Sequence, residues 1–179
     1  MEHFDSISYS KMLDISLQTE VVHRLSQYGL TLATAESCTG GLIASRITDI
    51  SGSSAVFHCG MVTYSNDMKI KMLGVNPKTL HDFSAVSAET AAEMARGVRR
   101  FSGADIAVAV TGNAGPLPSE GKPVGEVYIS LCCDWHEVTL RLEYGELSEG
   151  NVREQIRFLA SDKALQMVLE AINLREESK

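Results

Sequence analysis

Hydrophobic positions along the chain recur with two different periods. Between residues 13 and 28 apolar side chains return every three or four positions, and Gly29 stands where such a helix would end. The same spacing predicts helices at about 39–49, 66–73, 87–101 and 151–174. Apolar and polar side chains instead alternate over 127–132 and 138–144, which predicts an antiparallel hairpin with one face on the core.

Short apolar runs at 31–35, 58–64 and 106–110 predict buried strands. Helical and strand segments alternate along the first part of the chain, and the hairpin comes late. This order predicts an α/β fold: a three-layer α/β/α single domain over residues 13–175, with a mixed sheet that includes the late hairpin. Residues 1–12 have no clear period, and we expect a loosely ordered leader there.

Signals at the ends of two helices support these boundaries. Ser87 suits the N-cap of the helix that follows it, and Glu89 in its first turn favours the helix dipole. Gly74 and Gly103 stand where the helices at 66–73 and 87–101 would stop.

Composition narrows the class of protein. The chain has 179 residues, 44% hydrophobic and 22% charged, which is typical of a globular domain, and a net charge of −7 argues against sequence-independent binding of nucleic acid. The start lacks the features of a signal peptide, and no apolar run is long enough for a membrane span, so we expect a cytoplasmic protein without a membrane partner. The four cysteines form no CxxC pair, so neither a metal site nor a disulfide framework is expected.

The segment Ala35-Glu-Ser-Cys-Thr-Gly-Gly41 joins a predicted strand to a predicted helix. A serine at this turn, Ser37, has backbone N–H groups nearby and suits a nucleophile. From spacing alone the plainer alternative is favoured, in which Ser37 or Thr39 caps the helix. Cys38 is a rival nucleophile whose pKa a helix N-terminus would lower.

A serine nucleophile needs a base, and no histidine has a recognisable triad context. Lys69 follows the strand at 58–64 and can serve as base if burial leaves its amine neutral, with Tyr64 relaying a proton or orienting it. The plain alternative is a solvated lysine. A third segment, the turn Thr111-Gly-Asn-Ala-Gly-Pro116, follows the most apolar strand. Because parallel strands end at a common edge of a sheet, we expect these three segments to meet there.

Taken together, the blocks at 31–41, 52–54, 62–66 with Lys69, 85–87, 114–116 and 122–125 resemble the C-terminal domain of the CinA family. That domain also occurs as a stand-alone nicotinamide mononucleotide amidase, and the likeness spans about residues 20–172. The resemblance implies hydrolysis of nicotinamide mononucleotide to nicotinate mononucleotide and ammonia, without a cofactor. It implies Ser37 as nucleophile, Lys69 as base and Tyr64 as the third catalytic residue. The implied substrate contacts are Glu36, Thr39, Gly40, Gly41, Asn66, Thr111, Gly112, Ala114, Gly115 and Arg153.

The sequence departs from the family pattern at two places. Asn113 stands where the family has an apolar residue, and Leu117-Pro118 replace glycines after the turn. The family's Gly-Asp-Arg before the last helix is missing, which leaves Arg153 as the nearest arginine. These departures motivate an alternative, a non-catalytic or retuned paralogue that binds a nucleotide-like ligand or a protein partner. We also expect a homo-oligomer, and in a third hypothesis the last helix and the hairpin chiefly build its interface.

Overall fold

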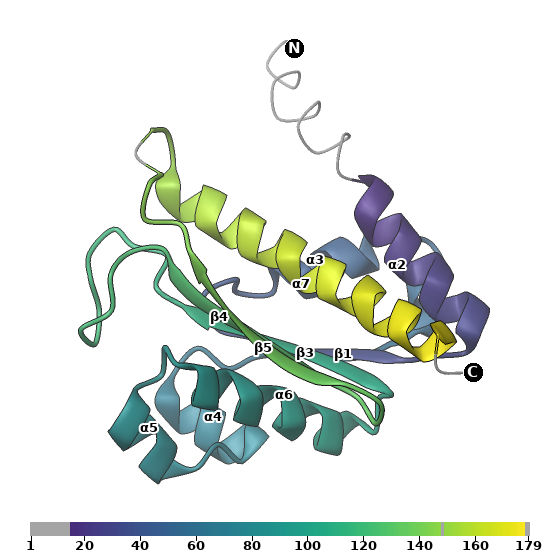
Figure 1. Ribbon diagram of the computed structural model, residues 1–179, viewed down its shortest axis with the longest axis horizontal. Coiled ribbons are helices and arrows are strands. Elements are labelled where there is room, and N and C mark those ends of the chain that lie inside the picture. The colour runs from purple at the N-terminus through teal and green to yellow at the C-terminus, as the bar shows by residue number, and fades with distance from the viewer. Residues whose placement is uncertain (1–14, 148, 178–179) are drawn as a thin grey trace.

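A five-stranded mixed sheet runs through the middle of the molecule in the computed structural model, which describes residues 15–147 and 149–177 (Figure 1). The strands are β1 (Leu32–Glu36), β2 (Phe57–Val62), β3 (Ile106–Gly112), β4 (Glu126–Cys132) and β5 (Glu137–Glu143). Their order across the sheet is β2-β1-β3-β4-β5. β1 is parallel to both β2 and β3, whereas β4 and β5 continue the sheet as an antiparallel hairpin.

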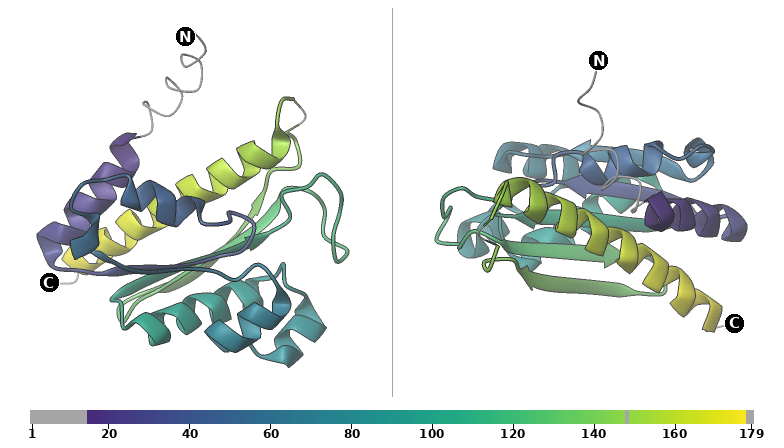
Figure 2. Two further views of the ribbon diagram at one scale, coloured as in Figure 1. Left: turned by 180° about the vertical axis from the view of Figure 1, so that it is seen from behind. Right: turned by 90° about the horizontal axis from the view of Figure 1, so that it is seen from above.

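Helices cover both faces of this sheet, so the predicted three-layer α/β/α fold is confirmed (Figures 1 and 2). One layer holds α2 (Ile15–Tyr28), α3 (Leu42–Thr48) and α7 (Val152–Glu177). The other holds α4 (Asn66–Leu73), α5 (Pro77–Phe83) and α6 (Ala88–Ser102), and a short 3-10 turn, η1 (Ser53–Ala55), precedes β2. Each layer packs its apolar side chains against its own face of the sheet and forms a separate core.

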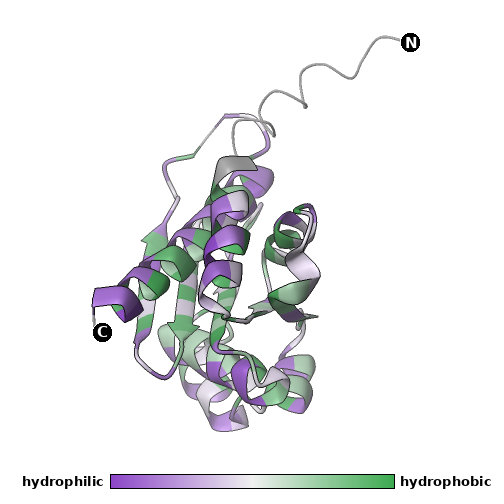
Figure 3. Cartoon of the chain, turned by 90° about the vertical axis from the view of Figure 1, so that its right-hand side faces the viewer, coloured by the Kyte–Doolittle hydropathy of each residue, from purple (hydrophilic) through white to green (hydrophobic). Residues whose placement is uncertain are grey.

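The helices alternate hydrophilic and hydrophobic positions along their length, as their packing on one side requires (Figure 3). Two of them begin and end where the sequence predicts. The Ser65 hydroxyl accepts the Met68 N–H at the start of α4, and the Ser87 hydroxyl accepts the Thr90 N–H at the start of α6. Gly74 and Gly103 close these helices with a φ of 70°, a left-handed conformation that glycine adopts readily. No helix in the described ranges is long and apolar enough to cross a bilayer.

The prediction for β4 was wrong, and one helix was not predicted. β4 is buried on both faces and not on one, because α6 covers the face of Ser130 and Cys132 while α7 covers the other. The helix α5 was not predicted. Because it contributes no fully buried side chain, its sequence shows no helical apolar period. Its signals are local, since Asn76 caps it through the Lys78 N–H and Pro77 opens it. The expected leader at 1–12 lies outside the described residues.

The loops after β1, β2 and β3 share one edge of the sheet, as predicted. Glu36, the last residue of β1, lies beside Val62 at the end of β2 and beside Val110 near the end of β3. The three segments with candidate chemistry are therefore neighbours in space.

Candidate active site

The turn after β1 holds the Ser37 main chain from two sides. Its N–H donates to the Val110 carbonyl of β3 at 2.9 Å, and its carbonyl accepts the Gly40 N–H at 3.0 Å. Because strand residues alternate between faces, Ser37 points toward the layer that contains α4, and only 9% of its surface is exposed. The sheet edge thus presents a nearly buried hydroxyl to a helix of the other layer.

Lys69 of α4 meets this hydroxyl. Its Nζ lies 3.1 Å from the Ser37 Oγ, and it also donates to the main-chain carbonyls of Thr63, at 2.9 Å, and Tyr64, at 3.4 Å. The side chain is 1% exposed. Burial is the largest effect on this amine and lowers its pKa, while the neighbouring Cys38 and Glu120 act in the opposite direction.

The contacts of the Lys69 amine suit a neutral base. A neutral amine has two N–H groups and one lone pair, and the two carbonyls of Thr63 and Tyr64 can take both N–H groups. The lone pair is then left for the hydroxyl proton of Ser37 across the same 3.1 Å. Among the described residues, none of the hydrogen-bond partners of Nζ is a carboxylate, so no ion pair holds the amine in its charged form.

Tyr64 contributes to this arrangement through its main chain. Its ring is 59% exposed, and its hydroxyl accepts a hydrogen bond of 2.8 Å from Arg153 of α7. The other arm of Arg153 donates to the Gly115 carbonyl at 2.7 Å. The expected hydroxyl relay therefore finds no contact here with Ser37 or Lys69, and Arg153 instead joins the loops that follow β2 and β3.

Glu36 has a different role from the expected substrate contact. Its carboxylate is 1% exposed and accepts the N–H groups of Gly41, Ile43 and Ala44 at 2.9 to 3.1 Å. It thus satisfies the first turn of α3, a task that the plainer hypothesis assigned to Ser37 or Thr39. Gly40 and Gly41 were also expected to contact substrate, and in this structure their N–H groups donate to the Ser37 carbonyl and the Glu36 carboxylate.

Several residues that were expected to contact substrate shape the turn after β3. The Thr111 hydroxyl donates to the Ala85 carbonyl at 2.7 Å and so joins β3 to the start of α6. A Cβ on Gly112 would lie 2.8 Å from a Val127 methyl group, so this glycine permits close packing on β4. Gly115 offers its carbonyl to Arg153, while Ala114 is 2% exposed and packs in the core.

Asn113, the departure from the family pattern, is fully engaged. Its amide donates to the carbonyls of Leu117 and Lys122 at 3.0 and 3.1 Å, and its side-chain oxygen accepts the Gly115 N–H at 2.9 Å. Asn113 is 7% exposed, and its three hydrogen bonds hold the loop together from the inside. The polar residue therefore stabilises a closed turn and leaves the sheet edge intact.

The pKa of Cys38 does not match the expectation for a rival nucleophile. Burial raises the pKa of this thiol to about 12, so it stays protonated at neutral pH. Cys132, at the other end of the sheet, is likewise held protonated, because burial raises its pKa to about 11. Ser37 is thus the better placed nucleophile.

The remaining predicted contacts and two unpredicted ones complete the site. Asn66 opens α4 with an exposed side chain, and Thr39 is buried behind the nucleophile. Sequence reasoning missed Arg157, which donates twice to the Thr39 carbonyl, and Glu120, which accepts the Ala85 N–H at 2.9 Å. The one available signal for Arg157 is its position, four residues and about one helical turn after Arg153.

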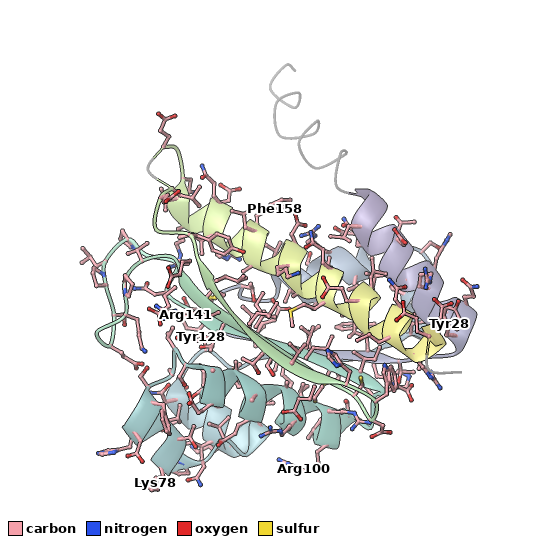
Figure 4. All side chains as sticks on the ribbon, in the orientation of Figure 1. Tyr28, Lys78, Arg100, Tyr128, Arg141 and Phe158 are labelled. Atoms are coloured by element: carbon pink, nitrogen blue, oxygen red, sulfur yellow. The ribbon has the colours of Figure 1, made fainter. Side chains whose placement is uncertain are left out.

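A hollow of about 290 Å³ at the far end of the sheet is separate from this site. Arg96, Arg99 and Arg100 line it beside the two adjacent cysteines. Figure 4 labels Arg100, which lies below α6 in that view and away from the strands. All three guanidinium groups already bond protein oxygens, so the hollow offers little free charge to a ligand. Within 15–147 and 149–177, no group of three or more His, Cys, Asp or Glu residues is placed to hold a metal ion.

Known proteins are similar to this chain in sequence and in fold. The family model of the CinA C-terminal domain matches residues 14–172. A CinA-like protein of Chlorobium limicola is 46% identical over 153 residues, which are 85% of this chain and 36% of that protein. One of Geobacter sulfurreducens is 55% identical over 119 residues, or 66% of this chain and 29% of that protein. The chain therefore spans about a third of the length of the curated relatives it matches.

Solved structures agree in length as well as in fold. The competence/damage inducible protein CihA from Agrobacterium tumefaciens has a TM-score of 0.82 and 44% identity, covering 89% of this chain and 94% of that one. The CinA superfamily protein of Escherichia coli has a TM-score of 0.80 and 34% identity, covering 87% and 88%.

Proposed function

The chain belongs to the CinA C-terminal domain family, and we propose that it is an amidase that hydrolyses nicotinamide mononucleotide to nicotinate mononucleotide and ammonia. The observation that carries the proposal is the contact of 3.1 Å between the Ser37 Oγ and the buried Lys69 Nζ. A serine and a neutral lysine in hydrogen-bond reach form the minimal pair for nucleophilic attack on an amide.

In the first half of the reaction, Lys69 takes the Ser37 proton as the Ser37 oxygen attacks the carboxamide carbon. A tetrahedral intermediate forms, the C–N bond breaks, and the proton on Lys69 passes to the leaving nitrogen, which departs as ammonia. The nicotinoyl group is then held as an ester on Ser37. Lys69 next takes a proton from water, the resulting oxygen attacks the ester, and Ser37 recovers its proton as the carboxylate leaves.

The oxyanion of each intermediate needs donors that the protein has not already used. The N–H groups of Ser37, Gly40 and Gly41 bond protein oxygens. We therefore assign this role to the N–H groups of Cys38 and Thr39, the next two residues of the turn. Neither has a backbone acceptor among the described residues.

Arg153 supplies the cation that an anionic nucleotide requires. Its guanidinium lies at the mouth of the site, between the exposed Tyr64 ring and the Gly115 carbonyl. A phosphate that replaced these two neutral acceptors would form stronger, charge-assisted hydrogen bonds with both arms. The proposed site thus joins a reacting end at Ser37 to a charged end at Arg153.

The test is release of ammonia from nicotinamide mononucleotide by the purified chain. Ser37→Ala and Lys69→Ala are expected to lower kcat at least about 1000-fold, since each removes a member of the reacting pair. Ser45→Ala and Lys71→Ala are matched controls, because both side chains are exposed on α3 and α4, and should retain full activity.

Two results would overturn the proposal. Equal turnover by Ser37→Ala and the unchanged protein would remove Ser37 as nucleophile. Tight binding of the nucleotide measured by calorimetry, with no ammonia released, would instead favour the non-catalytic paralogue.

A further inference from the structure

Arg157 on α7 contacts the turn at residues 37–41, called the nucleophile turn below. Its Nη2 and Nε donate to the Thr39 carbonyl at 2.8 and 3.2 Å. Two bonds from one rigid guanidinium that converge on the same oxygen hold its position more firmly than a single flexible donor does. The acceptor is only two residues from Ser37.

Gly40 suits the backbone of the turn beneath this guanidinium. Its φ of 60° is left-handed, a conformation that glycine adopts readily, while a Cβ there would meet the Arg157 Nη2 at an ordinary contact distance of 3.6 Å. The Gly40 N–H closes the turn on the Ser37 carbonyl. The peptide between Thr39 and Gly40 is therefore held by Arg157 at its oxygen and by Ser37 at its nitrogen.

Further contacts fix the position of α7 relative to α3. Arg46 of α3 is 5% exposed and donates to the Ser161 hydroxyl at 2.6 Å, and it pairs with Asp162 at 2.7 Å. Its guanidinium also stacks on Phe158, which Figure 4 labels on α7, at 4.9 Å. α7 thus holds both the nucleophile turn, through Arg157, and the helix that follows it, through Arg46.

The middle of the turn has no comparable anchor among the described residues. The Val110 carbonyl holds the Ser37 N–H and Glu36 holds the Gly41 N–H, but the Thr39 hydroxyl is buried without a partner among the described residues. Without Arg157, the Thr39 carbonyl loses its charged donor and keeps only a long bond of 3.3 Å from the Leu42 N–H. The peptide between Thr39 and Gly40 can then rotate, which loosens the Gly40 bond to the Ser37 carbonyl and shifts the Ser37 side chain relative to Lys69.

We propose that Arg157 is a positioning residue, which acts through the Thr39 carbonyl to hold Ser37 against Lys69. This inference rests on the proposed function for its role in amide hydrolysis, but the positioning of Ser37 can be measured separately. A misplacement of about 1 Å in a reacting group is enough to slow a reaction about 100-fold.

The experiment measures two reactions of the full chain. One is hydrolysis of nicotinamide mononucleotide, and the other is labelling of Ser37 by a fluorophosphonate, followed by intact mass, with Ser37→Ala as the blank. Arg157→Ala is expected to slow both by about 10- to 100-fold, with KM little changed. Arg157→Lys should recover part of the loss, because an ammonium can make one of the two bonds. Lys163→Ala removes a cation from the same helix, paired only with Glu170 on the surface, and should change neither rate.

Thermal unfolding of each variant separates positioning from folding, since both rates are expressed per folded molecule. Unchanged labelling and hydrolysis in folded Arg157→Ala would overturn the inference and leave the proposed function standing. If the unchanged protein labels at Ser37 but releases no ammonia, the proposed function fails, and the labelling rates still decide the role of Arg157. If the unchanged protein releases ammonia but does not label at Ser37, the hydrolysis rates alone decide the role of Arg157, and if it does neither, both proposals are overturned.

Discussion

Lys69 combines deep burial with a titratable amine, so its protonation links activity and stability to pH. Burial lowers its pKa in the folded chain, whereas in the unfolded chain it has the ordinary lysine value. Between these two values the unfolded state binds more protons, so the free energy of unfolding rises with pH in that window and is reduced below it. The lower of these two values, the pKa of Lys69 in the folded chain, sets the acid limb of kcat/KM, which should rise with pH as the amine becomes neutral.

Lys69→Met isolates this effect because methionine fills a similar volume and does not titrate. We expect the stability of the unchanged protein relative to Lys69→Met to increase with pH between the lowered pKa of the folded chain and the ordinary lysine value, by about 1.4 kcal/mol for each unit of pKa difference. Urea unfolding followed by the fluorescence of the single tryptophan, Trp135, measures it. Lys71→Met on the exposed side of α4 should show no such trend, and a flat difference for Lys69→Met would contradict a lowered pKa.

Glu36 is a buried carboxylate that supports the segment after Ser37 through the start of α3. Its two oxygens accept three N–H groups at the start of α3. Glu36→Gln leaves one oxygen and turns an amide donor toward N–H groups, so we expect a loss of about 3 kcal/mol in the free energy of unfolding and slower turnover. The comparison is Glu154→Gln in the first turn of α7, an exposed residue that should cost less than about 0.5 kcal/mol. A loss in Glu36→Gln no larger than in this control would show that α3 does not depend on the carboxylate.

At the level of elements, the position of Lys69 depends on how closely α4 approaches α6. A Cβ on Gly97 of α6 would lie 2.1 Å from the Leu73 carbonyl oxygen, a distance that no packing tolerates. Leu73 ends α4, one turn after Lys69. The absence of a side chain at Gly97 therefore sets the depth of α4, and with it the reach of the Lys69 amine.

Gly97→Ala is expected to push α4 away from α6. Alanine favours a helix over glycine by about 1 kcal/mol, but the overlap should outweigh this gain and give a net loss of about 1 to 3 kcal/mol. The shift of Lys69 should lower kcat more than it raises KM. Gly145→Ala is the control, because its Cβ would meet only the Val124 carbonyl at 3.6 Å. Full activity in Gly97→Ala would mean that the two helices can separate without moving the base.

Periodicity identified the elements that bury an apolar face and missed the one that does not. α6 has both a buried face and a serine cap, and its bounds follow from the sequence, whereas α5 lies on the surface and shows only its cap and proline. The common edge of β1, β2 and β3 also follows, because parallel strands align their ends. The pairing of Ser37 with Lys69 came from the family resemblance, since spacing alone favoured a helix cap.

The roles of Glu36 and Arg157 depend on tertiary packing that no local pattern encodes. A glutamate before the serine suits a substrate contact as well as a helix N-terminus, and only the fold of the turn decides between them. Arg157 reaches the Thr39 carbonyl because α7 packs against α3, although the two residues lie 118 positions apart in the sequence.

For the whole molecule, the candidate site bridges two layers with separate cores. Arg153 belongs to α7 of one helical layer, Lys69 belongs to α4 of the other, and Ser37 follows β1 of the sheet between them. A ligand that spans Ser37 and Arg153 would therefore contact segments whose cores lie on opposite faces of the sheet. The net charge of −7 does not oppose an anionic ligand here, because the arginines of α7 set the local field.

Binding should accordingly stabilise both layers at once. Ser37→Ala can hold nicotinamide mononucleotide without consuming it, and at about 100 times Kd the nucleotide should raise the free energy of unfolding by about 2.7 kcal/mol. Amide hydrogen exchange should slow at 37–41, at 63–69 and in the turn at 113–117, because these segments line the site. Exchange near Trp135 should stay unchanged, since its indole bonds the Ala171 carbonyl at the opposite end of the sheet. Protection confined to one layer, or centred on the hollow beside Arg100, would place the nucleotide elsewhere and remove the bridge between Ser37 and Arg153.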